Sequence, residues 1–194
     1  MRTYSPHFYL AFFLFLNIFN FIDRNLLIAF APQIKSDFNL TNVEWGLLTG
    51  VYFLFFYSVF GIFMGVLGDK FNRMKIAAAG VFLWSLMTAF TGMAKNFAHL
   101  IVARALIGVG ESALTPNSIS MLSDLYKQNK RGTASAIYYL GIPLGVGLAM
   151  LIASIFGPMF GWRAVFISLG LIGVGLAIIT YFLTEPIRGQ LDNP

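Results

Sequence analysis

Apolar residues gather in six long runs along this chain, and short polar segments separate the runs. We predict membrane-spanning helices at about residues 8–30, 43–67, 74–93, 98–123, 133–156 and 162–184, because about 20 consecutive apolar residues cross the hydrocarbon core of a bilayer. The connections are short, so neighbouring helices should be antiparallel. The predicted fold class is all-α, a polytopic six-helix bundle in which residues 1–187 form one transmembrane domain and residues 188–194 begin a tail or linker.

Composition supports a membrane protein. Of the 194 residues, 58% are hydrophobic and 11% are charged, whereas soluble domains have roughly 45–50% apolar and 25% charged residues. The chain has no cysteine, which excludes disulfides and thiolate metal sites, and we expect neither a metal nor another cofactor. The net charge of +5 comes from short loops, so it indicates membrane topology rather than nucleic-acid binding.

Basic residues are distributed unequally between the two ends of the predicted bundle. One end has three, Lys35, Lys95 and Arg163, and the other has eight: Arg2, Lys70, Arg73, Lys75, Lys127, Lys130, Arg131 and Arg188. Since cytoplasmic loops carry the excess of Lys and Arg, both termini should be cytoplasmic. We expect a multi-pass protein of a bacterial cytoplasmic (inner) membrane.

A polar stripe runs through the fourth apolar segment. At 100° per residue, Arg104, Gly108, Glu111, Thr115 and Ser118 share one helix face. A charge at bilayer depth costs at least about 2.5–3.5 kcal/mol on insertion scales. The stripe must therefore face other protein or a water-filled cavity.

The first apolar segment carries matching polar groups: Asn17, Asn20, Asp23 and Arg24. Helix rise places Asp23 roughly 12 Å and Arg104 roughly 9 Å from the outer end of the bundle, so these two could pair. Glu111 should lie about 10 Å deeper, near the midplane. Two helices thus direct polar side chains inward at similar depths.

Small residues recur at four-residue spacing, at Gly46 and Gly50 and again at Gly141 and Gly145. Such pairs allow helix backbones to approach closely, and we favour packing over a gating hinge as their role. Pro143 should kink the fifth helix.

The segment from Gly65 to Lys75, GVLGDKFNRMK, resembles the loop signature G-x-L-x-D-R-x-G-R-R-K of the major facilitator superfamily. Lys70 and Asn72 depart from that signature. The resemblance implies a cytoplasmic gate made of Gly65, Asp69, Arg73 and Asp124, and a loop that docks on a second half of the carrier. Physically, Asp69 can cap the next helix, and the Arg73 side chain can reach the Asp124 carboxylate.

Three further segments resemble the spinster family of lysolipid and sphingolipid transporters within that superfamily: FIDR at 21–24, RALIGVGES at 104–112 and EPIRG at 185–189. The anion:cation symporter family is the next resemblance, through RGTAS at 131–135. The superfamily has about twelve helices in two halves that rock against each other, each half a 3+3 inverted repeat. We therefore expect a half or fragment that pairs with a C-terminal six-helix half or a second copy.

The resemblance and the charges together predict a secondary active transporter that is coupled to protons and moves an organic anion or an amphipathic, lysolipid-like substrate by alternating access. Protons would be carried by Glu111 and Asp23, because burial favours the neutral acid and a nearby arginine favours the carboxylate. The predicted substrate-binding residues are Arg24, Arg104, Asn20, Asn17, Thr115 and Tyr138.

Other functions stay open at this point. The charges could form a purely structural ion network, or the chain could be a non-transporting assembly subunit. An intramembrane enzyme using Asp23, His99, Glu111 and Ser112 is disfavoured, because neither a His-Glu-x-x-His nor a Gly-x-Ser-x-Gly motif occurs. We expect no enzymatic activity.

Overall fold

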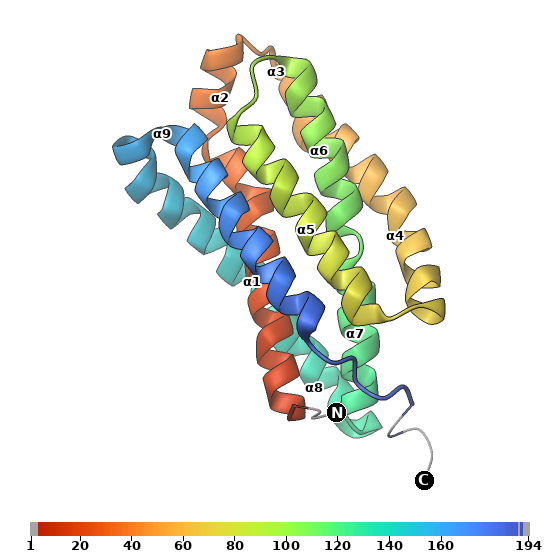
Figure 1. Ribbon diagram of the computed structural model, residues 1–194. Coiled ribbons are helices and arrows are strands. Elements are labelled where there is room, and N and C mark those ends of the chain that lie inside the picture. Colours follow the sequence, from red (N-terminus) through yellow and green to blue (C-terminus); the bar gives the residue numbers. More distant parts are fainter. Residues whose placement is uncertain (1–3, 190, 192–194) are drawn as a thin grey trace.

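The computed structural model describes residues 4–189 and 191, and these form a bundle of long helices (Figure 1). The elements are α1 (Pro6–Ala29), α2 (Ala31–Phe38), α3 (Asn42–Gly46), the π-helical turn η1 (Leu47–Val51), α4 (Tyr52–Lys70), α5 (Arg73–Gly92), α6 (Phe97–Glu111), α7 (Leu114–Leu125), α8 (Gln128–Tyr139) and α9 (Gly141–Phe182). The predicted all-α class is confirmed. Arg2, which contributed to the charge count, and residues 190 and 192–194 of the expected tail lie outside the described residues.

Polar side chains cap the starts of several helices: Ser5 for α1, Thr41 for α3, Asn72 for α5 and Asn96 for α6. Each accepts a hydrogen bond from a backbone N–H of the first turn, which has no partner within the helix. The expectation that Asp69 caps the helix after the loop is wrong. Asn72 Oδ1 accepts from Lys75 N at 2.9 Å, because Asp69 still belongs to the last turn of α4.

Helix α9 consists of two antiparallel arms, 141–160 and 162–182, and Figure 1 shows the chain doubling back between them. The turn lies at Gly161, whose φ of 76° and ψ of 157° suit a residue without a Cβ. The first arm and α8 together replace the helix predicted at 133–156. They separate at Leu140, three residues before Pro143, because that proline cannot donate a hydrogen bond to the carbonyl four residues earlier.

Two other segments also differ from the prediction. The range 98–123 is divided into α6 and α7 at Ser112 and Ala113, and Pro116 lacks the N–H that would bond to the Ser112 carbonyl. The segment after the first span, expected to be a loop, forms the short helix α2 with Pro32 in its first turn, where proline is tolerated. The interruption at Ser112 and Ala113 therefore lies within the segment that carries the polar stripe.

Glycine packing holds the first arm of α9 against α1. A Cβ added to Gly145 would lie 2.6 Å from the Ile18 carbonyl oxygen, and Gly141 is equally close to α1, which confirms close packing at this pair. The same expectation is wrong for Gly46 and Gly50, where an added Cβ would meet nothing within 4 Å. Those two glycines face away from the described helices.

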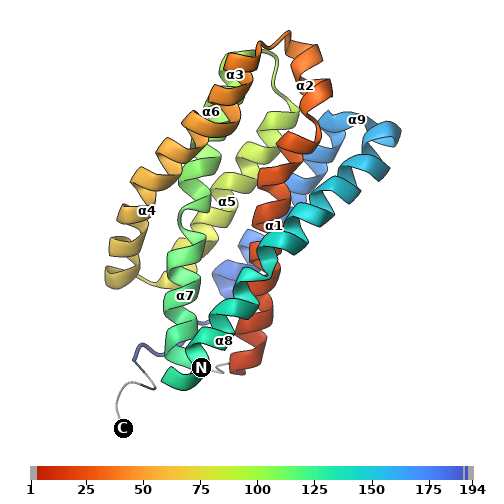
Figure 2. The same cartoon turned by 180° about the vertical axis from the view of Figure 1, so that it is seen from behind.

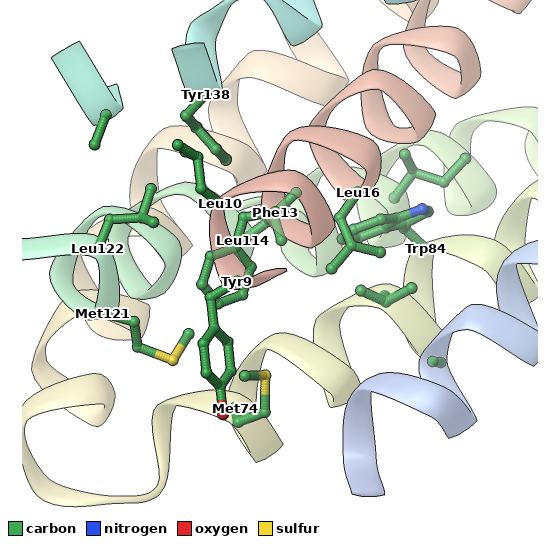
Figure 3. Close-up of a cluster of buried hydrophobic side chains, with 14 of the residues drawn as sticks. Tyr9, Leu10, Phe13, Leu16, Met74, Trp84, Leu114, Met121, Leu122 and Tyr138 are labelled. Carbon is green, nitrogen blue, oxygen red and sulfur yellow. The ribbon is translucent and has the colours of Figure 1, made fainter. Parts of the chain in front are cut away.

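The helices of the bundle are arranged around α5. Figures 1 and 2 show α5 in the middle, with α9, α1 and α6 around it, and α4 at the edge beside α6. One apolar cluster fills the end near the start of α1; Figure 3 shows Tyr9, Leu10, Phe13, Leu16, Met74, Trp84, Leu114, Met121, Leu122 and Tyr138. Tyr9 Oη donates to the Thr184 carbonyl at 2.7 Å, so the beginning of α1 and the segment after α9 meet at that end.

Candidate functional site

A buried ion pair joins α1 to α6. Arg24 Nη2 lies 2.6 Å from Glu111 Oε2, and Arg24 Nε donates to the same oxygen at 3.0 Å. The Glu111 side chain is fully buried, whereas 23% of the Arg24 side chain is exposed. The prediction that the charged stripe faces protein rather than lipid is confirmed, since Asp23 and Arg104 are also buried.

Asp23 lies beside this pair but bonds to a different helix. Its Oδ2 accepts a hydrogen bond from Thr88 Oγ1 on α5, and no described residue provides a partner for its Oδ1. The expected pairing of Asp23 with Arg104 is not found among the described residues; the pair that forms is Arg24 with Glu111. The cause is rotational, because neighbouring residues of a helix differ by 100° in direction.

Arg104 is held by an aromatic ring. Its guanidinium carbon lies 4.9 Å from the centroid of Phe53 on α4, and the Arg24 guanidinium carbon lies 4.6 Å from the same ring. Phe53 is 2% exposed. Arginine over an aromatic face is favourable by about 0.5–2 kcal/mol, so one buried ring serves two cations.

A layer of uncharged polar groups lies nearer the end where the beginning of α1 and the segment after α9 meet. Asn17 Nδ2 donates to the Tyr138 carbonyl at 2.8 Å, and Thr115 Oγ1 lies 3.2 Å from the Tyr138 hydroxyl. Asn20 is buried, and its Nδ2 has no partner among the described residues. The predicted substrate-binding residues are therefore divided into an ionic layer and this polar layer, about 10 Å apart along α1 by helix rise.

A second ion network lies at that same end. Arg73, the first residue of α5, places Nη1 2.6 Å from Asp124 Oδ2 and Nε 2.6 Å from Glu185 Oε1. It also donates to Ser120 Oγ at 2.9 Å. The predicted contact between Arg73 and Asp124 is confirmed, and the carboxylate of Glu185 joins it.

The segment after α9 closes this network. Arg188 donates to the backbone carbonyls of Gly68, Asp69 and Phe71, and the Gly189 N–H donates to Asp124 Oδ1 at 2.9 Å. One short segment thus fastens the end of α4 to the end of α7.

Gly65 and Asp69 take part in none of the ion pairs between described residues. Both line a hollow of about 160 Å³, together with Arg73 and Ser120, and a Cβ added to Gly65 would meet nothing within 4 Å. The four residues predicted as a gate therefore share one region, in which Arg73 and Asp124 form the pair and Gly65 and Asp69 form an open surface.

Three residues of the site were not predicted from the sequence: Phe53, Thr88 and Glu185. Phe53 and Thr88 stand in apolar runs without any local distinguishing pattern. Glu185 did carry a signal, because it begins the EPIRG segment, but that resemblance does not indicate which residues Glu185 contacts.

Comparison with known proteins gives matches over most of the chain. The family model of the Major Facilitator Superfamily matches residues 13–194. The chain is 31% identical to Protein spinster of Drosophila melanogaster over 180 residues, covering 92% of this chain and 30% of that protein. It is 36% identical to the Sphingosine-1-phosphate transporter SPNS2 of Danio rerio over 184 residues, covering 92% of this chain and 36% of that protein.

A solved structure matches the fold closely. A bacterial homolog to the human lysosomal transporter spinster, in an inward-facing and occupied conformation, superposes with a TM-score of 0.87 and 32% identity, covering 99% of this chain and 47% of that one. The chain thus spans about a third of the length of these curated relatives and about half of the solved structure.

Proposed function

The chain belongs to the major facilitator superfamily, whose members are transporters and not enzymes, and we propose that it forms the N-terminal half of a proton-coupled carrier. Such carriers work by alternating access, with the substrate site near the midplane between two halves. The observation that supports this best is the buried Arg24–Glu111 ion pair at the end of α6. Intramembrane charges of this kind are usually functional.

Charge balance explains how a proton and an anion could travel together. Asp23 and Glu111 carry two negative charges when ionised, and Arg24 and Arg104 carry two positive ones, so the cluster is neutral. Protonation of Glu111 removes the ion that holds Arg24 and leaves a net charge of about +1 in a buried site, which favours an anion. The proton and the anionic substrate would therefore load in the same step.

The surroundings of Arg24 favour an amphipathic anion. Its guanidinium carbon lies 5.0 Å from the Phe21 ring centroid and 4.9 Å from that of Tyr57, so the partly exposed cation is bordered by apolar surface. A guanidinium binds phosphate or carboxylate oxygens in bidentate geometry, while the rings would cover a hydrocarbon chain. The relative named for sphingosine-1-phosphate supports a phosphate ester with an apolar tail, with the polar layer at Asn17 and Tyr138 as a second contact region.

The remaining half of the carrier would cover α4. This helix exposes large apolar side chains: Leu54, Phe55, Ile62, Phe63 and Val66. We propose that a C-terminal six-helix half, or a second copy of this chain, packs there and over the open surface at Gly65 and Asp69. The Arg73–Asp124 network would then gate the cytoplasmic side, with both termini in the cytoplasm of a bacterial cell.

Uptake into proteoliposomes tests the proposal. The assembled carrier, meaning this chain with its second half, is supplied with a radiolabelled lysophospholipid under an imposed pH gradient. Glu111→Gln should abolish pH-driven uptake but retain exchange of internal for external substrate, because only the proton-dependent step is lost. Asp37→Asn, a similar change at an exposed carboxylate, is the matched control. Normal pH-driven uptake by Glu111→Gln would refute the coupling role.

A non-transporting membrane subunit that acts only when paired with a second half is the second candidate. Reconstitution of the chain alone, and again with a C-terminal half, separates the two. Uptake only in the second case supports the half-carrier, and no uptake of any anion in either case supports the subunit.

A further inference from the structure

An apolar groove of about 290 Å³ runs between α5 and the second arm of α9. Its floor is made of small residues, Ala78 and Ala177, which are 2% and 3% exposed. Its walls are the exposed side chains of Phe82, Ile178 and Tyr181. The groove lies on the outer face of the bundle, away from the Arg24–Glu111 pair on α1 and α6.

One end of the groove carries a positive charge. Lys75, in the first turn of α5, lines the groove, and its ammonium nitrogen lies 5.5 Å from the Tyr181 ring centroid. Among the described residues, no carboxylate lies within ion-pair distance of Lys75. The Tyr181 ring therefore contacts the Lys75 ammonium at one end of the apolar groove, where no described carboxylate balances its charge.

The depth of this cation suits a lipid headgroup. Lys75 follows the connection between α4 and α5 directly, so it lies where a spanning helix leaves the hydrocarbon. From Lys75 to Phe82 the groove extends about 10 Å into the membrane by helix rise, and its lining there is apolar. Basic pockets between transmembrane helices bind anionic lipid headgroups, and interfacial lysines each attract such lipids by about 1 kcal/mol.

We propose that this groove is a binding site for an anionic phospholipid, with the phosphate at Lys75 and one acyl chain over Ala78 and Ala177. Charge complementarity selects the anionic headgroup, and the small floor residues accept the chain. The site is separate from the substrate site and does not depend on the proposed transport function.

Lipid binding to the purified, assembled protein tests this site by native mass spectrometry with phosphatidylglycerol and phosphatidylcholine as probes. Wild type should bind phosphatidylglycerol more tightly. Lys75→Gln should weaken phosphatidylglycerol binding about fivefold, the factor equivalent to about 1 kcal/mol, and leave phosphatidylcholine unchanged. Lys95→Gln, an exposed lysine at the opposite end of the bundle, is the matched control.

A second variant tests the groove itself. Ala79→Phe places a ring in the groove from an exposed position of α5 and should weaken binding of both lipids without unfolding the bundle. Equal effects of Lys75→Gln and Lys95→Gln would overturn the proposal, because the attraction would then be a general property of the surface charge. No effect of Ala79→Phe would also overturn it, since the acyl chain would then lie elsewhere or a partner helix would cover the groove.

Discussion

Replacing Arg73 with alanine should destabilise the protein more than any exposed charge deletion. The guanidinium lies 2.6 Å from both the Asp124 and Glu185 carboxylates, and the side chains of the three residues are 5%, 11% and 14% exposed. Without Arg73, the Asp124 carboxylate would stay nearly buried with no cation among the described residues, whereas Glu185 would keep Arg188 at 3.2 Å. Removing one partner of a buried pair costs about 3–5 kcal/mol, and the partial exposure here favours the lower value, about 3 kcal/mol.

Unfolding in mixed micelles of dodecyl maltoside and SDS measures this loss, and a double-mutant cycle assigns it. Arg73→Ala and Asp124→Asn would be measured alone and together, and residues in one network should couple by about 0.5–3 kcal/mol. The exposed pair Arg163–Asp37, with side chains 42% and 44% exposed at 3.5 Å, is the control cycle and should couple by less than about 1 kcal/mol. Additive losses at Arg73 and Asp124 would refute the view that they act as one unit.

Three further changes test the packing of the site by the same unfolding assay. Gly145→Leu should cost about 1–3 kcal/mol by overpacking against α1, whereas Gly147→Leu, where an added Cβ meets nothing within 4 Å, should change stability by less than about 0.5 kcal/mol; equal losses would contradict the packing argument. Thr88→Val removes the donor to Asp23 and should cost about 1–3 kcal/mol, and a smaller loss is expected when Asp23→Asn is already present. Phe53→Leu should cost more than Phe53→Tyr, because only the former loses two guanidinium contacts of about 0.5–2 kcal/mol each; the reverse order would show that the ring acts by shape alone.

Much of the fold could be predicted because the membrane restricts the choices. Long apolar runs must be helices, and charges within them must face inward, so the burial of Asp23, Arg104 and Glu111 followed from the pattern alone. The contact between Arg73 and Asp124 also followed, because both residues flank short connections at one end of the bundle.

Pairing within the site could not be predicted for a geometric reason. A shift of one residue turns a side chain by 100° but moves it only 1.5 Å along the axis, so matching depths cannot separate Asp23 from Arg24. The choice is made by close contacts such as Gly145 against Ile18, which fix how α1 is rotated. The interruption before Pro116 was not predicted, and at Pro143 a kink was predicted where two helices separate. The reason is that an interrupted helix has the same apolar pattern as a continuous one.

Burial within the ionic cluster is unequal, so its charged side chains are not equally accessible from outside. Glu111 has 0% of its side chain exposed, whereas Arg24 has 23%, and Asp23 and Arg104 are nearly as buried as Glu111. Among these four described residues, Arg24 is therefore the one that an anion or a helix arriving from outside can contact most readily. If it draws the guanidinium away, the Glu111 carboxylate loses the cation that it contacts at 2.6 Å. The accessible arginine would thus transmit a binding event to a carboxylate that the ligand does not touch, and the coupling proposed above depends on this contact.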